Sequence, residues 1–243
     1  MVSINKRLTF QVATNPADER TLTLSSTTNK GHFISLRPFV RPTESEKDFP
    51  YEWAFAGTSS HAKSSATDGD SITIDFNFQF DTNVYLNKEN THRGEVHTLW
   101  TTWESGCVEE RGKVFPFGAE NEGVDFFELW QPIDATRDEF VILGNESEQD
   151  PNARSIALTL NNGEFEGLIV VVGKWAQGIL FKKNDHTTKG VNILRAVEKQ
   201  KGQWQTLLKY GADFDKFPVK FEAEEGASVV AGNATWEVIE SNV

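Results

Sequence analysis

The stretch from Asp70 to Asp81 constrains the fold more strongly than any other part of the chain. Large apolar residues and polar residues alternate along it without a break. The apolar positions are Ile72, Ile74, Phe76, Phe78 and Phe80. Side chains on a β-strand point to opposite faces with a period of two, whereas a helix would scatter these residues around its circumference. The pattern therefore predicts a long, half-buried strand of an antiparallel sheet, with these five side chains on one face.

Similar short segments recur through the whole chain, separated by turn residues. We count about sixteen to eighteen candidate strands at spacings of roughly 8–14 residues, which is typical of β-sandwiches and β-barrels. The 18 Phe and 7 Trp residues favour strands and supply a large apolar area. Residues 192–201 fit a strand or a short helix, one helical turn is expected at residues 213–216, and residues 58–69 are expected to form an exposed loop open to modification. Further strand candidates are residues 84–86, 139–143 and 217–221.

The length of 243 residues allows one large β domain or two small ones of about 120 residues each. A weak internal echo leaves duplication and chance equally open. It relates Trp53-Ala54 and Gly57 to Trp175-Ala176 and Gly178, and Thr102-Trp103-Glu104 to Thr235-Trp236-Glu237. Pro116, Gly118 and Gly123 accompany several acidic residues near the midpoint. We therefore expect an N-terminal domain over residues 1–118 and a C-terminal domain over residues 119–243.

The net charge of −12 argues against nucleic acid or an anionic membrane as the main partner, because both need concentrated Lys and Arg. The single cysteine, Cys107, excludes a disulfide framework within the chain. The N-terminus has no apolar core of signal-peptide length, and no apolar run approaches the roughly 20 residues that span a bilayer. We expect a location in the cytosol and nucleus, so the sequons at Asn145 and Asn233 are expected to stay unused.

Candidate catalytic and metal-binding residues are few. His92, Glu95 and His97 lie close together in the sequence, but a metal site needs a further ligand and an open position that the pattern does not supply. Cys107 has no base at a spacing that would favour a thiolate nucleophile. Serine-hydrolase, phosphate-loop and dinucleotide-binding motifs are absent from the sequence. We therefore assign no catalytic, cofactor or metal residue and expect a protein that is not an enzyme.

Two features of the second half bear on binding. Residues 173–175, Gly-Lys-Trp, match the short G-x-W signature of lipocalin-like barrels, although that signature belongs near a barrel's first strand. Residues 168–172 are apolar on both faces of a strand, so another segment or a second subunit must cover the outer face. This run predicts a homodimer. A barrel interior lined by Trp and Phe is either packed solid or forms a pocket for a small apolar ligand.

Several segments across the chain resemble the fungal HRI protein family, named for interaction with a casein kinase I. They are residues 33–39 (FISLRPF), 52–58 (EWAFAGT), 81–87 (DTNVYLN), 91–95 (THRGE), 105–110 (SGCVEE), 128–132 (ELWQP), 152–156 (NARSI) and 236–240 (WEVIE). The resemblance implies two lipocalin-like, antiparallel β-barrel domains in tandem, located in the cytoplasm and nucleus. It also implies association with casein kinase I and with a component of the endoplasmic-reticulum protein translocation machinery. It brings no catalytic or ligand-binding residue with it.

Three functional hypotheses follow. The first is a non-enzymatic adaptor that presents an acidic surface and loops to protein partners. The second is a carrier of a small hydrophobic ligand, which requires a barrel cavity of about 300 Å³ or more lined by aromatic residues. The third, an enzyme, has no constellation of residues to support it. The resemblance favours the adaptor.

Overall fold

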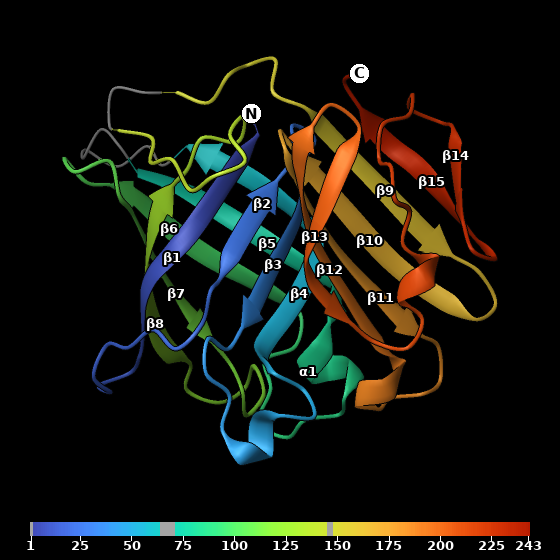
Figure 1. Cartoon of the computed structure of the whole chain (residues 1–243). Coiled ribbons are helices and arrows are strands. Elements are labelled where there is room, and N and C mark those ends of the chain that lie inside the picture. The colour runs from blue at the N-terminus through green and yellow to red at the C-terminus, as the bar shows by residue number, and fades with distance from the viewer. Residues whose placement is uncertain (1, 64–70, 145–147) are drawn as a thin grey trace.

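A computed structural model describes residues 2–63, 71–144 and 148–243. Figure 1 shows two β structures that lie side by side, a barrel formed by the N-terminal strands and a curled sheet formed by the C-terminal strands. The described part of the chain is nearly all β, with only short helical turns. The expected all-β fold with two tandem antiparallel barrel domains is confirmed, and the second of them is an open half-barrel.

Within the described residues, eight strands form the closed barrel. Each pairs antiparallel with its neighbour in the sequence, and β1 pairs with β8 to close the ring. This up-and-down order is that of lipocalin-like barrels. The strands are β1 (Ser3–Val12), β2 (Leu24–Thr27), β3 (His32–Pro38), β4 (Tyr51–Lys63), β5 (Ser71–Asp81), β6 (Glu95–Thr102), β7 (Val108–Val114) and β8 (Val124–Pro132).

The described C-terminal strands form a seven-stranded sheet with the order β13-β12-β11-β10-β9-β15-β14. Its two edge strands, β13 and β14, do not pair with each other, so the sheet curls without closing. The strands are β9 (Ser155–Asn161), β10 (Phe165–Val172), β11 (Trp175–Lys182), β12 (Val191–Gln200), β13 (Gln203–Tyr210), β14 (Ser228–Ala231) and β15 (Ala234–Ser241).

Strand β8 marks where the barrel ends. The division expected from the sequence lies after residue 118, whereas β8 begins at Val124 and pairs with both β7 and β1. Without β8 the barrel would keep two unpaired edges. The barrel therefore extends to Pro132. The internal echo does not relate equivalent positions, because Trp103 is exposed after β6 while Trp236 is buried within β15.

The strand expected at residues 70–81 is β5, and Ile74, Phe76 and Phe78 line the barrel interior. Beyond Phe78, the apolar side chains of β5 no longer lie on this face. In the register with β4, Ala56 is opposite Phe80 and Gly57 is opposite Phe78, so Gln79 is the extra residue of a β-bulge. Phe80 therefore packs outside the barrel, where its ring lies 6.2 Å from that of Phe181 on β11. The expectation of five apolar side chains on one face is wrong for Phe80.

Two expectations about the first half are also corrected. Residues 84–86 do not form a strand, because the Asp81 carboxylate accepts hydrogen bonds from the backbone N–H groups of Asn83 and Val84 and caps the short helix α1 (Thr82–Tyr85). The exposed loop expected at residues 58–69 is strand as far as Lys63, and residues 64–70 lie outside the described part.

In the second half, the ambiguous residues 192–201 belong to strand β12, and the expected helical turn is the 3₁₀ turn η3 (Phe214–Lys216). Residues 217–221 are not a strand, and residues 139–143 form only an isolated bridge. Two further 3₁₀ turns are η1 (Glu44–Glu46) and η2 (Thr188–Gly190). None of the helices in the described ranges is long and apolar enough to cross a membrane.

The apolar run on β10 is covered on both faces by this chain itself. Leu168, Val170 and Val172 belong to the apolar cluster between the barrel and the sheet. Ile169 and Val171 belong to a second cluster on the concave face of the sheet, which also contains Phe217 and Phe221 from the segment after β13. The run therefore no longer calls for a second subunit, and the homodimer stays a prediction.

Buried polar contacts also join the sheet to the barrel. The Arg195 guanidinium, from β12, donates hydrogen bonds to the carbonyl oxygens of Leu22 (3.1 Å) and Leu36 (3.0 Å). It also donates to Gln177 Oε1 (2.9 Å), and the Nε2 amide group of Gln177 in turn donates to Ser26 Oγ (3.0 Å) on β2. Burial lowers the pKa of Arg195 to about 9, which still leaves the group charged at neutral pH. These contacts lock β11 and β12 against β2 and β3.

Candidate ligand site inside the barrel

The barrel encloses a cavity of about 240 Å³ whose wall is mainly aromatic. A second hollow of about 370 Å³ shares Ser25, Phe76 and Trp100 with it, so these three side chains stand between two compartments of the interior. The aromatic residues that line the first cavity are Phe10, Phe33, Trp53, Phe55, Phe76, Phe78, Trp100, Phe126 and Trp130.

Strand alternation and register bring these rings together. Trp53 and Phe55 alternate along β4, while Phe76 and Phe78 alternate along β5, so each pair points into the barrel. The ring centroids of Phe55 and Phe78 lie 4.7 Å apart across the two strands. Phe33, from β3, meets Phe76 edge to face at 4.9 Å. Such contacts are favourable between aromatic rings, so the wall is a packed aromatic surface rather than a set of separate side chains.

A buried ion-pair cluster forms one side of the cavity. Glu128, on β8, is 2% exposed and accepts hydrogen bonds from two guanidinium groups. Arg7 Nη1 lies 2.7 Å and Arg37 Nη1 lies 2.8 Å from Glu128 Oε1. Arg7 also donates to the carboxylates of Glu19 (2.6 Å) and Glu52 (2.9 Å). Buried charges need such partners, because an unpaired charge away from water is very costly.

The pKa values of this cluster follow from its geometry. Burial by itself would lower the pKa of Arg7, but the carboxylates of Glu128, Glu19 and Glu52 outweigh it and raise that pKa above its ordinary value. For Glu19, burial acts in the opposite direction, and the Arg7 guanidinium nevertheless lowers the pKa of the carboxyl. Arg7 and Glu19 are therefore both charged at neutral pH.

Glu110 behaves differently from the other carboxyl groups. It lies directly opposite Glu128 in the β7–β8 register, and it is buried. Burial and then the Glu128 carboxylate raise the pKa of Glu110 to about 8, so the group is protonated at neutral pH. Its Oε2 accepts a hydrogen bond from the indole N–H of Trp130 at 2.9 Å. Glu110 therefore adds a neutral polar group to the cavity wall.

Two polar groups on β3 face the cavity without a hydrogen-bond partner in the described part of the chain. They are Ser35 Oγ and Arg37 Nε, in side chains from residues that are 1% and 6% exposed. Asn83 Oδ1, also on the cavity wall, and Asp81 Oδ2 are the other unpaired buried atoms in the described residues. Such groups are rare in native proteins, where buried polar atoms are nearly always paired.

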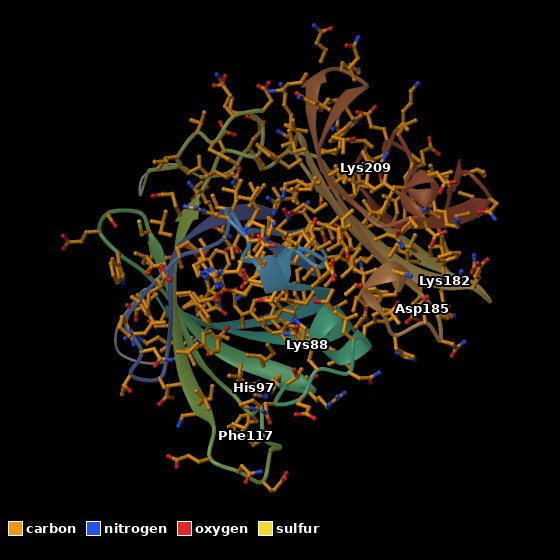
Figure 2. All side chains as sticks on the ribbon, turned by 60° about the horizontal axis from the view of Figure 1, so that its bottom comes forward. Lys88, His97, Phe117, Lys182, Asp185 and Lys209 are labelled. Atoms are coloured by element: carbon orange, nitrogen blue, oxygen red, sulfur yellow. The ribbon has the colours of Figure 1, made fainter. Side chains whose placement is uncertain are left out.

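The residues considered as a metal site do not form one cluster. His97, labelled in Figure 2, is exposed on the outside of the barrel. Its Nδ1 lies 2.6 Å from Asp75 Oδ1. His92 is buried, with Nδ1 accepting from the backbone N–H of Phe115 and Nε2 close to the carbonyl oxygen of Glu95. In the described residues, no three His, Cys, Asp or Glu side chains are arranged to hold a metal ion. Cys107 is half-buried near the Gln131 side chain.

The Gly-Lys-Trp match at residues 173–175 lies outside the closed barrel, at the turn from β10 to β11. Gly173 adopts a positive φ of 57° there, and a Cβ atom would meet the carbonyl oxygen of Ala135 at 2.1 Å. Trp175 is buried, stacks on Phe140, and donates its indole N–H to the carbonyl oxygen of Arg137. This tryptophan holds the linker after β8 against the sheet.

The concave face of the second sheet is filled by the chain's own side chains. Trp236 and Phe221 are fully buried there, and Phe217 packs against Trp236 with a ring separation of 5.8 Å. Trp204 meets Phe221 edge to face at 4.8 Å. These rings occupy the space that a ligand would need, so the candidate site belongs to the first barrel.

Sequence reasoning missed the polar residues of the cavity, although a signal for them exists. Ser35 and Arg37 share a face of β3 with Phe33, and Glu128 shares a face of β8 with Phe126 and Trp130, so each lies on a face that carries buried aromatic residues. A charged residue on such a face must find a partner inside the protein.

Comparison with known proteins shows the family. The family model described as "Protein HRI1" matches residues 3–240. Proteins of that name from Lachancea thermotolerans and Kluyveromyces lactis are 59% and 53% identical to this chain over all of its length, which covers 94% and 100% of theirs. The crystal structure of protein YLR301w from Saccharomyces cerevisiae superimposes with a TM-score of 0.93 at 47% identity, with both chains fully covered. The chain therefore belongs to the Protein HRI1 family.

Proposed function

We propose that this protein binds a small, mainly apolar ligand inside its closed barrel. The observation that carries the proposal is the aromatic cavity of about 240 Å³, which the folded chain leaves unfilled. Closed barrels that enclose such a space are a recurrent architecture for binding one small molecule. In the second sheet of the same chain, by contrast, the protein's own side chains fill the concave face.

The volume limits the size of the ligand. The cavity does not reach the roughly 300 Å³ that the carrier hypothesis requires for a typical ligand, so only a smaller ligand fits. It is larger than an apolar cavity of about 150 Å³, which is enough to hold benzene. We therefore propose a compound of one or two rings. The shared wall of Ser25, Phe76 and Trp100 would have to move before a longer molecule could reach the second compartment.

The chemistry of the wall supports binding rather than turnover. Both oxygens of Glu128 already accept hydrogen bonds from guanidinium groups, and the Glu110 carboxyl accepts one from Trp130. In the described cavity wall, no hydrogen bond joins either carboxyl group to a hydroxyl or thiol that it could activate as a nucleophile. A non-enzymatic role therefore remains our proposal.

The proposal can be tested by calorimetric titration with tetralin, an uncharged two-ring hydrocarbon. We expect saturable binding with one site per chain. Val96→Phe places a larger side chain in the cavity wall opposite Phe76 and should abolish binding. The matched control is Val230→Phe, because Val230 is 69% exposed on β14. It should leave the tetralin affinity unchanged.

Because Val96→Phe could overpack the barrel, Ser25→Leu provides a second variant that fills the same space from β2. Circular dichroism of each variant shows whether the β structure is retained. Unchanged tetralin affinity in a folded cavity-filling variant would place the binding elsewhere and overturn the proposal, as would the absence of any binding to the wild-type protein.

Association with casein kinase I and with the translocation machinery stays a prediction that rests on the family resemblance, as does a cytoplasmic and nuclear location. The net charge of −12 is compatible with a basic protein partner. Co-purification of the tagged protein, compared between wild type and surface-loop variants of equal stability, tests this adaptor role. It can hold together with ligand binding, because the proposed ligand lies inside the barrel and partners would bind outside.

A further inference from the structure

We infer that the ligand of the barrel is an uncharged ring compound carrying a hydrogen-bond acceptor, which Ser35 Oγ and Arg37 Nε bind. This inference rests on the proposed function and adds the chemical class of the ligand. It is carried by the two unpaired polar groups that β3 presents to the cavity.

The strand geometry aims both groups into the cavity. Ser35 is directly opposite Ser25 on β2 and Phe55 on β4, and all three line the cavity. Arg37 lies two residues further along β3 and therefore on the same face. Its guanidinium carbon lies 4.9 Å from the ring centre of Phe55 and 5.2 Å from that of Trp53, so the rings hold the group in place.

The hydrogen bonds of Arg37 leave Nε as the one guanidinium nitrogen without a partner among the described residues. Nη1 and Nη2 donate to Glu128 at 2.8 and 3.3 Å, whereas Nε–H has no acceptor among the described residues. A guanidinium group has no acceptor atoms, so only an acceptor can satisfy it. The Ser35 hydroxyl, on the same face of β3, is a second donor without a partner. A buried donor without a partner costs folding free energy, and a ligand acceptor would recover that cost on binding.

The charges around the cavity favour an uncharged ligand. Arg7 and Arg37 face the carboxylates of Glu128, Glu52 and Glu19, so the negative groups already outnumber the positive ones. A carboxylate ligand would add a further negative charge in an apolar setting. A cationic ligand would place its charge beside the buried guanidinium of Arg37. A ketone or ether oxygen meets neither penalty.

A series of compounds on one ring frame tests the inference. The frame is tetralin, and its derivatives are 1-tetralone with a carbonyl acceptor, 1-aminotetralin with an ammonium group, and 1,2,3,4-tetrahydro-1-naphthoate with a carboxylate. Calorimetric titration at neutral pH should rank 1-tetralone first, about threefold to tenfold tighter than tetralin, as expected for one net hydrogen bond. Both charged compounds should bind more weakly than tetralin.

Ser35→Ala separates recognition from a structural role. The variant should weaken 1-tetralone binding by about threefold and leave tetralin binding unchanged. Because it removes an unpaired buried hydroxyl, it should also leave the ligand-free protein at least as stable as wild type in urea. The control is Ser228→Ala, since Ser228 is exposed on β14 and should affect neither compound.

The outcomes are distinguishable. If tetralin and 1-tetralone bind equally well, the inference fails while the proposed function stands. If the carboxylate compound bound most tightly of the four, the inference would also be overturned, and the result would point to an anionic ligand. If none of the four compounds binds, the proposed function fails and the inference fails with it. A preference for 1-tetralone that persists unchanged in Ser35→Ala would place its acceptor against another group.

Discussion

At the scale of single residues, Glu128 has the most demanding position in the barrel. It is the shared counter-ion of Arg7 and Arg37, and all three side chains are almost entirely withdrawn from water. Breaking a buried ion pair by removing one partner costs more than the pair itself contributes, because the other charge is left behind. The cluster therefore makes this wall of the cavity rigid and intolerant of substitution.

Replacing Glu128 with Gln should lower the free energy of unfolding by about 3–5 kcal/mol, because two buried guanidinium groups lose their common carboxylate. Urea denaturation of the variant measures this. The control is Glu225→Gln, whose ion pair with Lys30 lies on the surface, and its effect should be far smaller. Equal effects of the two substitutions would show that the cluster does not stabilise the barrel.

Glu110 should make stability depend on pH. Its pKa is about 8 in the folded protein and about 4.5 in the unfolded chain, so between these values only the folded state holds the proton. The free energy of unfolding should therefore fall as the pH rises from 4.5 to 8, by about 1.4 kcal/mol per pH unit. Glu110→Gln keeps an acceptor for Trp130 and removes this contribution. Urea denaturation across that range should show the wild type losing stability relative to the variant, and parallel curves would contradict the assignment.

The sequence predicts the residues of the cavity wall only in part. Alternation in residues 70–81 correctly places Phe76 and Phe78 on the buried face of a strand. The ion-pair cluster could not be derived in the same way, because Arg7 and Glu128 are separated by 121 positions and meet only when β1 pairs with β8. The local sequence pattern predicts on which face of a strand a side chain lies, whereas strand pairing across the barrel determines which side chains it contacts.

At the scale of elements, the β4–β5 pair shows how one extra residue redirects a strand. The bulge at Gln79 lets β5 line the barrel with Phe78 and then face the second sheet with Phe80. Gly57 makes this possible, because a Cβ atom at that position would meet the carbonyl oxygen of Asn77 at 2.0 Å.

Gly57→Ala should therefore destabilise the protein by about 1–3 kcal/mol, since the backbones of β4 and β5 would have to separate. The matched control is Gly163→Ala in the β9–β10 turn, where an added Cβ atom meets nothing within 4 Å. Thermal or urea unfolding should place the control close to wild type. If Gly57→Ala were as stable as Gly163→Ala, the close approach at the bulge would not exist.

Elements were predictable where the pattern is local and long. The strands at residues 70–81 and 95–103 follow from alternation, whereas α1 depends on the Asp81 cap and the bulge depends on a neighbouring strand. Residues 217–221 show the reverse error. Their apolar side chains are buried on the concave face of the second sheet, although the segment itself is irregular. The sequence therefore shows the apolar pattern of a strand where no strand forms.

At the scale of the whole molecule, the barrel and the sheet share one apolar cluster. It contains Ile34 and Ala54 from the barrel together with Val170 and Ile179 from the sheet, and the Arg195 contacts cross the same boundary. The sequence predicts two tandem β-barrels but does not predict that the second one is open. Its strand order pairs β15 with β9, and some 80 positions of the sequence separate the paired residues.

This shared core predicts that the two β structures unfold together. Amides in the centre of β3 and of β11 should show the same free energy of opening in native-state hydrogen exchange, equal to that of global unfolding. Mass spectrometry of peptides from the two strands, at several urea concentrations, measures both values in one sample. Clearly lower protection of one strand than of the other would show that the two parts open independently.

The most direct test of the central claim is a crystal structure of the protein with 1-tetralone. The account predicts the rings within the aromatic wall formed by Phe55, Phe76 and Phe78. It places the carbonyl oxygen within about 2.7–3.2 Å of Ser35 Oγ or Arg37 Nε. Rings bound only on the outer surface, with the cavity filled by the protein's own side chains, would contradict a ligand site inside the barrel.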